Sequence, residues 1–486
     1  MSSAAPAPPI SEHLARFAAS LRYEEIPEAV RERAKYLMLD ATGIALASTR
    51  EDFARKTLAG LSSLGEGGGH ALIGMNPRLP LRDAVVMNGV LVHGLDFDDT
   101  HTPGAIHATA SAFPCALGVA EKTGADGRAL LTAYLIGVET ATRLASVTEG
   151  GFHQVGFHPT GLVGAFGCVL LAGRLLGLTP EQLVMAQGIV LSTASGSLEF
   201  IQDGAWTKRM HPGWAGAGAI TAAALAKEGY IAPRAAYEGR FGLFPSHLGE
   251  YAADVDYGRA TAGLGETWEI GRVAVKPFPA CHFAHACADA AIALAREQGV
   301  KPADVERIEV SVPPQVVKAI CEPEADKKRP SSAYAAQFSV HYITAASLTR
   351  GRFGLAELTR ESWTDPDILA LAAKVNYVED PSFPFPEYYS GQVAVTTRDG
   401  RQLVHREEKN RGAGDRPIAA AEIEAKYLDN ATLAVSRSRA ESIRDLILTL
   451  DECSDARLVA NALAGAEAAP LAHDEHAIPG RRTHTG

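Results

Sequence analysis

Apolar residues recur with helical spacing through the first half of the chain. Val30, Ala34, Leu37, Ala41 and Ile44 follow one another at intervals of three and four residues, which places them on one face of a helix. Similar apolar, alanine-rich segments punctuated by Gly or Pro span 81–95, 108–122, 128–146, 161–177, 181–197 and 215–228. Because strand-like alternation is nearly absent here, residues 1–267 are predicted to form an all-α domain.

The pattern changes near residues 266–276. Ile308, Val310 and Val312 alternate with polar or charged residues, which predicts a half-buried strand. Short apolar segments at 393–395 and 403 flank Asp399-Gly400, a dipeptide suited to a type I′ hairpin turn. Helical patterns cover 281–297 and 333–349. Residues 268–412 are therefore predicted to form a smaller α+β domain.

Helical spacing returns over 420–428, 439–450 and 454–464. We expect residues 413–466 to pack back on the first domain, and residues 467–486, rich in His, Pro, Gly and Arg, to be disordered. The predicted fold class is mainly α, with a large all-α domain and a smaller α+β domain.

Composition narrows the class of protein. With 486 residues, 47% hydrophobic and 21% charged, the chain has enough apolar content for a large core, which excludes a disordered or fibrous protein. The net charge is −11 and no basic run occurs, so a nucleic-acid partner is not expected. An anionic substrate would need positive charge placed locally, because the overall field repels it.

The cysteine pattern and the N-terminal residues favour a cytoplasmic protein. Six cysteines lie without CxxC pairs, which is typical of reduced thiols, and the first residues lack a secretory pattern. The uncharged stretch 151–173 contains His, Pro and several Gly, and Arg174 follows it at once. We interpret it as a loop leading into a buried helix, and no membrane association is expected.

The densest polar cluster is His93-Gly-Leu-Asp-Phe-Asp-Asp-Thr-His101, with His107 shortly after. Three interpretations stay open at this point. The cluster could be a solvated loop that caps the next helix. It could be a divalent-metal site, because Asp96, Asp98, Asp99 and His107 offer suitable ligands. It could also supply the groups for acid–base catalysis.

Two further clusters hold histidine and basic residues. His158 lies between glycines and Pro159, where it is either structural or catalytic. Lys208, Arg209 and His211 are three potentially cationic side chains within four residues of an acidic protein. They form either a carboxylate clamp or a basic surface turn.

A fourth cluster runs from Lys276 to Cys287. Cys281 and His285 are four residues apart and could ligate zinc on a helix, but no further ligands are evident. The glycine-rich run 65–70 matches no phosphate-binding motif and is interpreted as a loop. No GxSxG or HExxH motif occurs.

Taken together, the clusters resemble the MmgE/PrpD family, which includes 2-methylcitrate dehydratase, cis-aconitate decarboxylase and iminodisuccinate epimerase. The resemblance extends over nearly all of 10–465. The motifs that carry it are Leu39-Asp40, Val86-Met-Asn-Gly89, His93 to Thr100, Phe157-His-Pro-Thr160, Lys208, Lys276 to His285 and Phe338 to Ala346.

The resemblance implies an active site in the cleft between the two domains, a homodimer, and catalysis without a metal or organic cofactor. The implied catalytic residues are Asp96, Thr100, His107, His158, Lys208 and Tyr342. Position 281 is His in the decarboxylase-like members but Cys281 here, with His282 beside it, and Pro277 replaces a basic residue. These differences weigh against decarboxylation, and both Cys281 and His282 are kept as catalytic candidates.

The family's reactions share the need for a carbanion beside a carboxylate. Such a step requires a base and strong electrostatic stabilisation. We expect Lys208, Lys276, Arg209 and His211 to bind carboxylate, and His107 or His158 to act as base. The partner imidazole or Tyr342 would serve as acid, and Asp96 would orient one imidazole.

The predicted function is that of a hydro-lyase of the 2-methylcitrate dehydratase type, acting on a small di- or tricarboxylate. A decarboxylase or epimerase using the same site is the alternative within the family. A metal-dependent enzyme built on the aspartate cluster and a non-catalytic carboxylate-binding protein are the alternatives outside it.

Overall fold

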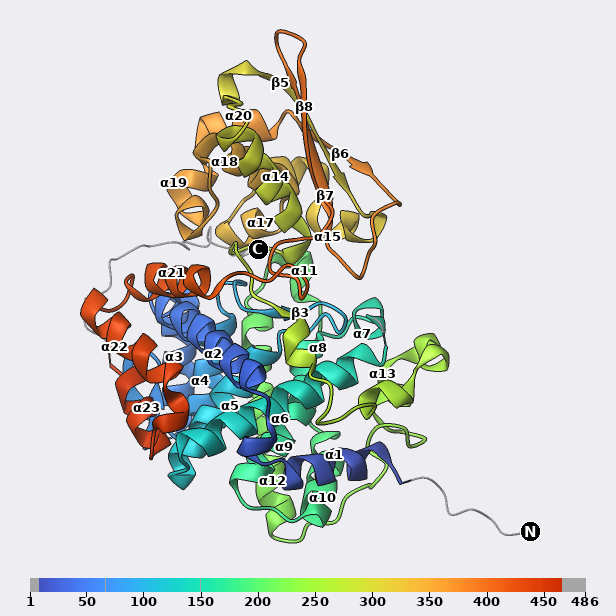
Figure 1. Cartoon of the computed structure of the whole chain (residues 1–486), viewed down its shortest axis with the longest axis vertical. Coiled ribbons are helices and arrows are strands. Elements are labelled where there is room, and N and C mark those ends of the chain that lie inside the picture. Colours follow the sequence, from blue (N-terminus) through green and yellow to red (C-terminus); the bar gives the residue numbers. More distant parts are fainter. Residues whose placement is uncertain (1–7, 66, 149, 466–486) are drawn as a thin grey trace, which may run out of the picture.

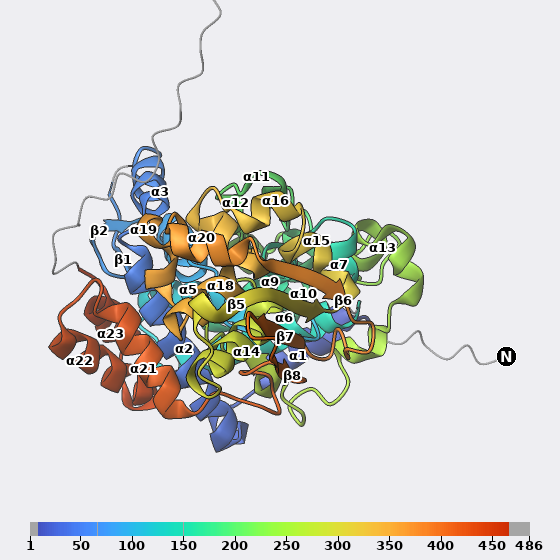
Figure 2. The same ribbon diagram turned by 90° about the horizontal axis from the view of Figure 1, so that it is seen from above.

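The computed structural model describes residues 8–65, 67–148 and 150–465, so the predicted disordered tail 467–486 lies outside the described residues. A large helical body carries a smaller domain that contains the main sheet (Figure 1). The predicted fold class is thus confirmed. Seen from above, the last three helices lie at one end of the molecule and α13 lies at the other (Figure 2).

The large body is built around long, mostly buried helices. Its helices are α1 (Ile10–Ser20), α2 (Glu28–Ser48), α3 (Asp52–Ser62), α4 (Leu81–His93), α5 (Ala108–Thr123), α6 (Gly127–Ser146), α7 (Gly151–Gln154), α8 (Pro159–Leu162), α9 (Gly164–Leu175), α10 (Pro180–Val190), α11 (Phe200–Asp203), α12 (Thr207–Lys227) and α13 (Leu243–His247). The uncharged stretch leads into α9, whose residues Gly164 to Gly173 are all buried in the core. None of the helices in the described residues is both long and apolar enough to cross a membrane.

Short strands and 3₁₀ turns complete the structure. The strands are β1 (His70–Leu72), β2 (Met75–Leu79), β3 (Thr100–His101), β4 (Val273–Ala274), β5 (Val305–Val312), β6 (Val375–Glu379), β7 (Gly391–Thr397) and β8 (Gln402–Glu407). The 3₁₀ turns are Tyr23–Glu25, Gly249–Asp254, Tyr257–Ala260, Glu269–Arg272, His282–Ala284, Pro302–Asp304, Pro314–Val316, Leu355–Leu358 and Leu450–Glu452.

The smaller domain packs helices against a four-stranded sheet of order β6-β5-β7-β8. β5 is parallel to β6 and antiparallel to β7, and Asp399-Gly400 lies in the predicted hairpin between β7 and β8. The turn is not of the predicted type I′, because of these two residues only Gly400 has a positive φ, of 85°. The helices are α14 (His285–Arg296), α15 (Val317–Ile320), α16 (Glu324–Lys328), α17 (Ala333–Gln337), α18 (Val340–Arg350), α19 (Arg360–Trp363) and α20 (Pro366–Ala372).

The chain returns to the large body through α21 (Ala420–Ala431), α22 (Arg437–Leu448) and α23 (Ala456–Leu463), and α21 lies beside α2 (Figure 1). Apolar residues from 10–275 and 418–463 form one hydrophobic core, and residues from 278–395 form a second. The junction between the two cores therefore falls at the sequence cluster around Lys276.

Several element limits differ from the sequence expectation. The helix predicted over 215–228 begins at Thr207, so Lys208 lies in its first turn. The helix predicted over 333–349 is interrupted at Ser339, whose side chain accepts a hydrogen bond from the Tyr342 backbone N–H and starts a new helix. The short strands β1, β2 and β6 were not predicted, because three to five residues give too little alternation.

Candidate active site

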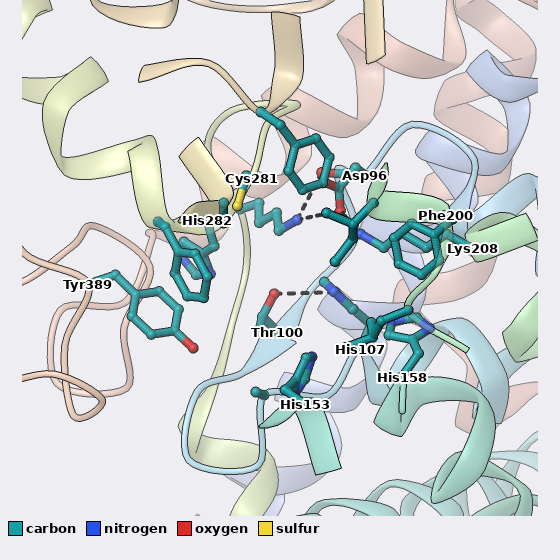
Figure 3. Close-up of a pocket in the computed structure, with 17 residues that line it drawn as sticks. Asp96, Thr100, His107, His153, His158, Phe200, Lys208, Cys281, His282 and Tyr389 are labelled. Carbon is teal, nitrogen blue, oxygen red and sulfur yellow. Dashed lines mark hydrogen bonds and ion pairs between the residues drawn. The ribbon is translucent and has the colours of Figure 1, made fainter. Parts of the chain in front are cut away.

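A cavity of about 130 Å³ opens between the two hydrophobic cores. Figure 3 shows polar side chains from both domains directed into it. The lining residues are Asp96, Thr100, Ala105, His107, His153, His158, Leu198, Phe200, Ile201, Lys208, Lys276, Cys281, His282, Phe283, Ala319, Phe338 and Tyr389.

Two backbone features bring the cavity residues together. α4 and α12 cross at Gly89 and Gly213, where a Cβ on Gly89 would lie 2.4 Å from the Gly213 Cα, so the helices approach more closely than larger residues permit. This crossing brings the start of α12 toward the loop that follows α4. β3 pairs with β4, with Thr100 opposite Ala274, which places Lys276 beside the same loop.

Asp96 joins two lysines at the centre of the cavity. Its Oδ1 atom accepts hydrogen bonds from Lys208 Nζ at 2.7 Å and Lys276 Nζ at 2.9 Å. Burial favours the neutral acid, but Lys208 and Lys276 outweigh it and hold the pKa of Asp96 well below its usual range. Two ammonium groups thus face one carboxylate, which leaves one positive charge available to an anionic ligand.

Asp96 has a left-handed backbone with φ 51°, which is uncommon for a residue other than glycine. Side chains from three elements hold the three carbonyls at this turn. Arg209 Nε donates to Gly94 O at 2.7 Å, Gln337 Nε2 to Leu95 O at 2.7 Å, and Lys276 Nζ to Asp96 O at 2.9 Å. These contacts compensate for the strain of the turn.

His107 has a defined tautomer. Its Nδ1 lies 2.7 Å from the Asp99 carbonyl oxygen, which can only accept, so Nδ1 carries the proton and Nε2 is the unprotonated nitrogen. Thr100 Oγ1 lies 3.3 Å from the same Nδ1 (Figure 3). Burial, together with the charges of Lys276 and Lys208, outweighs the attraction of Asp98 and keeps the pKa of His107 well below 6.5. The ring is therefore a neutral base at neutral pH.

His158 lies beside His107 in a cluster of imidazoles. Its Nδ1 is 3.0 Å from His211 Nδ1, and its ring stacks on His93 with centroids 5.5 Å apart and 21° between the planes. Burial, followed by the neighbouring His93 and Lys208, lowers the pKa of His158 well below 6.5. His158 is accordingly neutral and can exchange a proton with His211 or with a bound ligand.

The acidic residues predicted as metal ligands do not gather around one point. Asp98 Oδ2 accepts from His93 Nδ1 at 2.7 Å, and Asp99 accepts from the Thr109 backbone and hydroxyl. In the described part of the chain, the one group that could hold a metal ion is His93, His107 and His158, with ring nitrogens within 4.8 Å of one another. His93 and His158 stack with 21° between their ring planes, and their Nδ1 atoms already face Asp98 and His211.

The smaller domain contributes Cys281, His282 and Tyr389. Asn410 Nδ2 donates to His282 Nε2 at 3.0 Å, and burial lowers the pKa of His282 to about 3. Burial raises the pKa of the Cys281 thiol, which is therefore protonated at neutral pH. The Tyr389 ring packs edge-on against His282, with its hydroxyl directed toward the cavity (Figure 3).

Most of the residues singled out in the sequence line this one cavity: Asp96, Thr100, His107, His158, Lys208, Lys276, Cys281 and His282. Tyr342, which was expected to act as an acid, does not line this cavity. Its hydroxyl donates to the Glu357 carbonyl oxygen within the core of the smaller domain, because the break at Ser339 sets the direction of α18.

Arg209 and His211, expected to bind substrate, also lie outside this lining. Arg209 follows Lys208 on a helix and so points in another direction, toward a separate cavity. His211 lies behind His158 and contacts it through Nδ1. Cys281 and His285, considered as zinc ligands from the sequence, do not lie on one helix, because Cys281 precedes α14. His285 Nε2 donates instead to the Ala280 carbonyl oxygen.

Sequence reasoning missed His153, Phe200, Phe338 and Tyr389. His153 lies on the four-residue helix α7, inside the stretch interpreted as a loop, and burial lowers its pKa to about 4. No sequence pattern marks the three aromatic residues as part of a functional site. The Asn410 side chain, which binds both His282 and the Tyr389 backbone, explains how Tyr389 reaches the cavity from a distant segment.

The chain is similar to known proteins over most of its length. The MmgE/PrpD N-terminal domain matches residues 12–255, and the MmgE/PrpD C-terminal domain matches residues 278–452. A cis-aconitate decarboxylase of Aspergillus terreus is 26% identical over 92% of this chain and 94% of its own length. Cis-aconitate decarboxylases of Mus musculus (26% identical; 96% of this chain, 95% of theirs) and Homo sapiens (27%; 94% and 95%) are similar as well.

Proposed function

This chain belongs to the MmgE/PrpD family, and we propose that it is a lyase acting on a small di- or tricarboxylate. The reaction passes through a carbanion next to one of the substrate carboxylates. The observation that carries the proposal is the pair Lys208 and Lys276 on a single carboxylate, facing neutral imidazoles in one cavity.

The two lysines bind the carboxylate next to the reacting carbon. When the neighbouring C–H bond breaks, negative charge grows on that carboxylate, and a fixed ammonium group stabilises it most strongly in the transition state. Asp96 sets the position of both lysines and offsets part of their charge. Apolar side chains of Leu198, Phe200 and Phe338 exclude water from this end of the cavity and strengthen the interaction.

His107 is the base in this proposal. Its Nδ1–H bond to the Asp99 carbonyl fixes the ring and leaves the Nε2 lone pair to accept the substrate proton. His158 is neutral and hydrogen-bonded to His211, so it positions the departing hydroxyl group, and the proton that His107 takes from carbon is the one that protonates this hydroxyl. The proton on carbon passes to His107, the C–O electron pair leaves with the oxygen, and water and an alkene result.

Decarboxylation is a second candidate, favoured by the names of the relatives. There the C–C bond to a carboxylate breaks, carbon dioxide leaves, and the resulting carbanion takes a proton from solvent through one of the imidazoles. The neutral Cys281 thiol stands at a position where the family resemblance leads us to expect His in a decarboxylase, and this difference favours dehydration.

One product analysis distinguishes the candidates. Hydroxy di- and tricarboxylates and their unsaturated counterparts are incubated with the chain, and products are followed by proton NMR and by trapping of carbon dioxide. Dehydration yields an alkene in equilibrium with the hydroxy acid and no gas, whereas decarboxylation releases gas in equal amount to product. If no member of the panel reacts, the proposed substrate class is wrong.

A further inference from the structure

A second cavity lies behind the Asp96 turn, between the large body and the smaller domain. It encloses about 390 Å³ and shares no lining residue with the active-site cavity. The same chain segments form the wall between the two cavities. Leu95, Arg209 and Gln337 line the second cavity, while their neighbours Asp96, Lys208 and Phe338 line the first.

Arg209 is the basic group in the wall of this cavity. Its guanidinium lies 4.5 Å from the Phe53 ring centroid and 5.4 Å from that of Tyr334. A guanidinium has five N–H donors, and the hydrogen bond to Gly94 uses only Nε. Nη1 is buried without a hydrogen-bond partner in the described part of the chain.

A buried guanidinium with unused donors is costly unless an acceptor meets it. The Tyr334 hydroxyl, on the same wall, is also buried without a partner among the described residues. Arg50 adds a second positive charge to the lining, which also holds the carboxylates of Glu51 and Asp52; Asp52 is already paired with Arg55 and Lys56, and the charge of Glu51 acts on Arg209. The unused donors of Arg209 and the Tyr334 hydroxyl are of the kind that bind carboxylate or phosphate oxygens.

The rest of the lining is largely apolar and includes Phe53, Leu95, Leu355, Leu358 and Leu433. Such walls bind the body of a ligand, while a few polar groups fix its orientation. We propose that this cavity is a second ligand site, which takes a small oxyanion carried on an apolar body, with the oxyanion on Arg209. The assignment is independent of the reaction proposed for the first cavity.

Equilibrium dialysis tests the proposal with hexanoate as the probe. The Lys208→Met chain is used as the background, because it removes the carboxylate anchor of the active site. We expect it to bind one equivalent of hexanoate, and the added Arg209→Gln change to weaken that binding at least tenfold. Hexan-1-ol, which has the apolar body without the charge, should bind at least tenfold more weakly than hexanoate. Hexyl phosphate in place of hexanoate shows which oxyanion the site prefers.

A cavity-filling variant gives a second test, which decides the proposal if Arg209→Gln does not fold. Ala356 is exposed at the cavity lining, so Ala356→Phe fills space without removing a polar group. It should abolish the same equivalent of hexanoate binding, while Ala373→Phe, outside the lining, should not. Hexanoate binding that is unchanged in both Arg209→Gln and Ala356→Phe would overturn the proposal, as would equal binding of hexan-1-ol.

Discussion

Lys208 and Lys276 depend on a single acidic partner, Asp96. Because the three charged groups are buried, their interactions are little screened by solvent, and each member strongly influences the other two. Removing one lysine leaves Asp96 neutralised by the other but removes the extra positive charge. The excess charge, rather than either ion pair alone, is what the proposed reaction requires.

We therefore expect Lys208→Met to lower kcat/KM by about 10²-fold or more, with part of the loss in kcat. The reason is that its charge interacts most strongly with the transition state. Lys227→Met is the matched control, since Lys227 lies exposed at the other end of α12. Circular dichroism checks that both variants fold, and a fully active Lys208→Met enzyme would refute the role given to this residue.

The lowered pKa values of His107 and His158 predict how kcat/KM depends on pH. Burial and nearby positive groups lower the pKa of His107 and of His158 well below 6.5, so both stay neutral as the pH falls through 6.5. A base with a lowered pKa loses activity only at lower pH. The acid limb of the kcat/KM profile should hence lie well below pH 6.5. An acid limb at or above pH 6.5 would show that neither imidazole is the base.

The loop after α4 is the element on which the site depends. Its Gly94, Leu95 and Asp96 carbonyls are held by Arg209 from α12, Gln337 from α17 and Lys276 beyond β4. Gln337 Nε2 also donates to the Pro279 carbonyl at 3.0 Å. One side chain of the smaller domain thus fixes the loop of the large body and the junction beside Lys276.

We expect Gln337→Leu to lower the free energy of unfolding by about 1–3 kcal/mol, because it leaves two buried carbonyls unsatisfied. It should also lower kcat/KM by about tenfold, since Asp96 loses its support. Gln315→Leu, the same change at an exposed position, serves as control. Denaturant unfolding and steady-state kinetics measure both effects. If Gln337→Leu matches Gln315→Leu in both, the loop does not depend on this contact.

The elements that could be predicted are those whose structure is determined by residues close together in the sequence. The long helices of the large body and the hairpin at Asp399-Gly400 follow from local periodicity and turn chemistry. β6 could not be found in this way, because its pairing with β5 joins residues far apart in the chain. The start of α12 was missed because Gly213 and Pro212 weaken the helical pattern near Lys208.

At the scale of the whole molecule, the site was predictable where its motifs are local. Asp96, Thr100 and His107 lie in one segment, and the cleft between domains was implied by the family resemblance. Side-chain direction was not predictable: Lys208 and Arg209 are neighbours but line different cavities. Tyr389 reaches the site through tertiary contacts, among them the hydrogen bond from its backbone N–H to Asn410 and the packing of its ring on His282. The homodimer and the cytoplasmic location stay predictions, which light scattering and fractionation test.

At the same scale, we expect the enzyme to act without a metal ion. The proposed acid, base and charge stabiliser are all side chains, so activity should be unchanged after exhaustive treatment with EDTA or phenanthroline. The measurement is turnover before and after chelation, with each of Mg²⁺, Mn²⁺ and Zn²⁺ added back. Activity that is lost and then restored by one ion would make His93, His107 and His158 its ligands instead.

The most direct test of the central claim is proton exchange at carbon. An unsaturated di- or tricarboxylate that the chain consumes is incubated with it in D₂O, and the product is examined by NMR. A carbanion next to a carboxylate must take its proton from solvent, so the product should carry deuterium at that carbon. His107→Asn should slow its appearance by about 10²–10⁴-fold. Complete conversion without deuterium at any carbon next to a carboxylate would contradict the account.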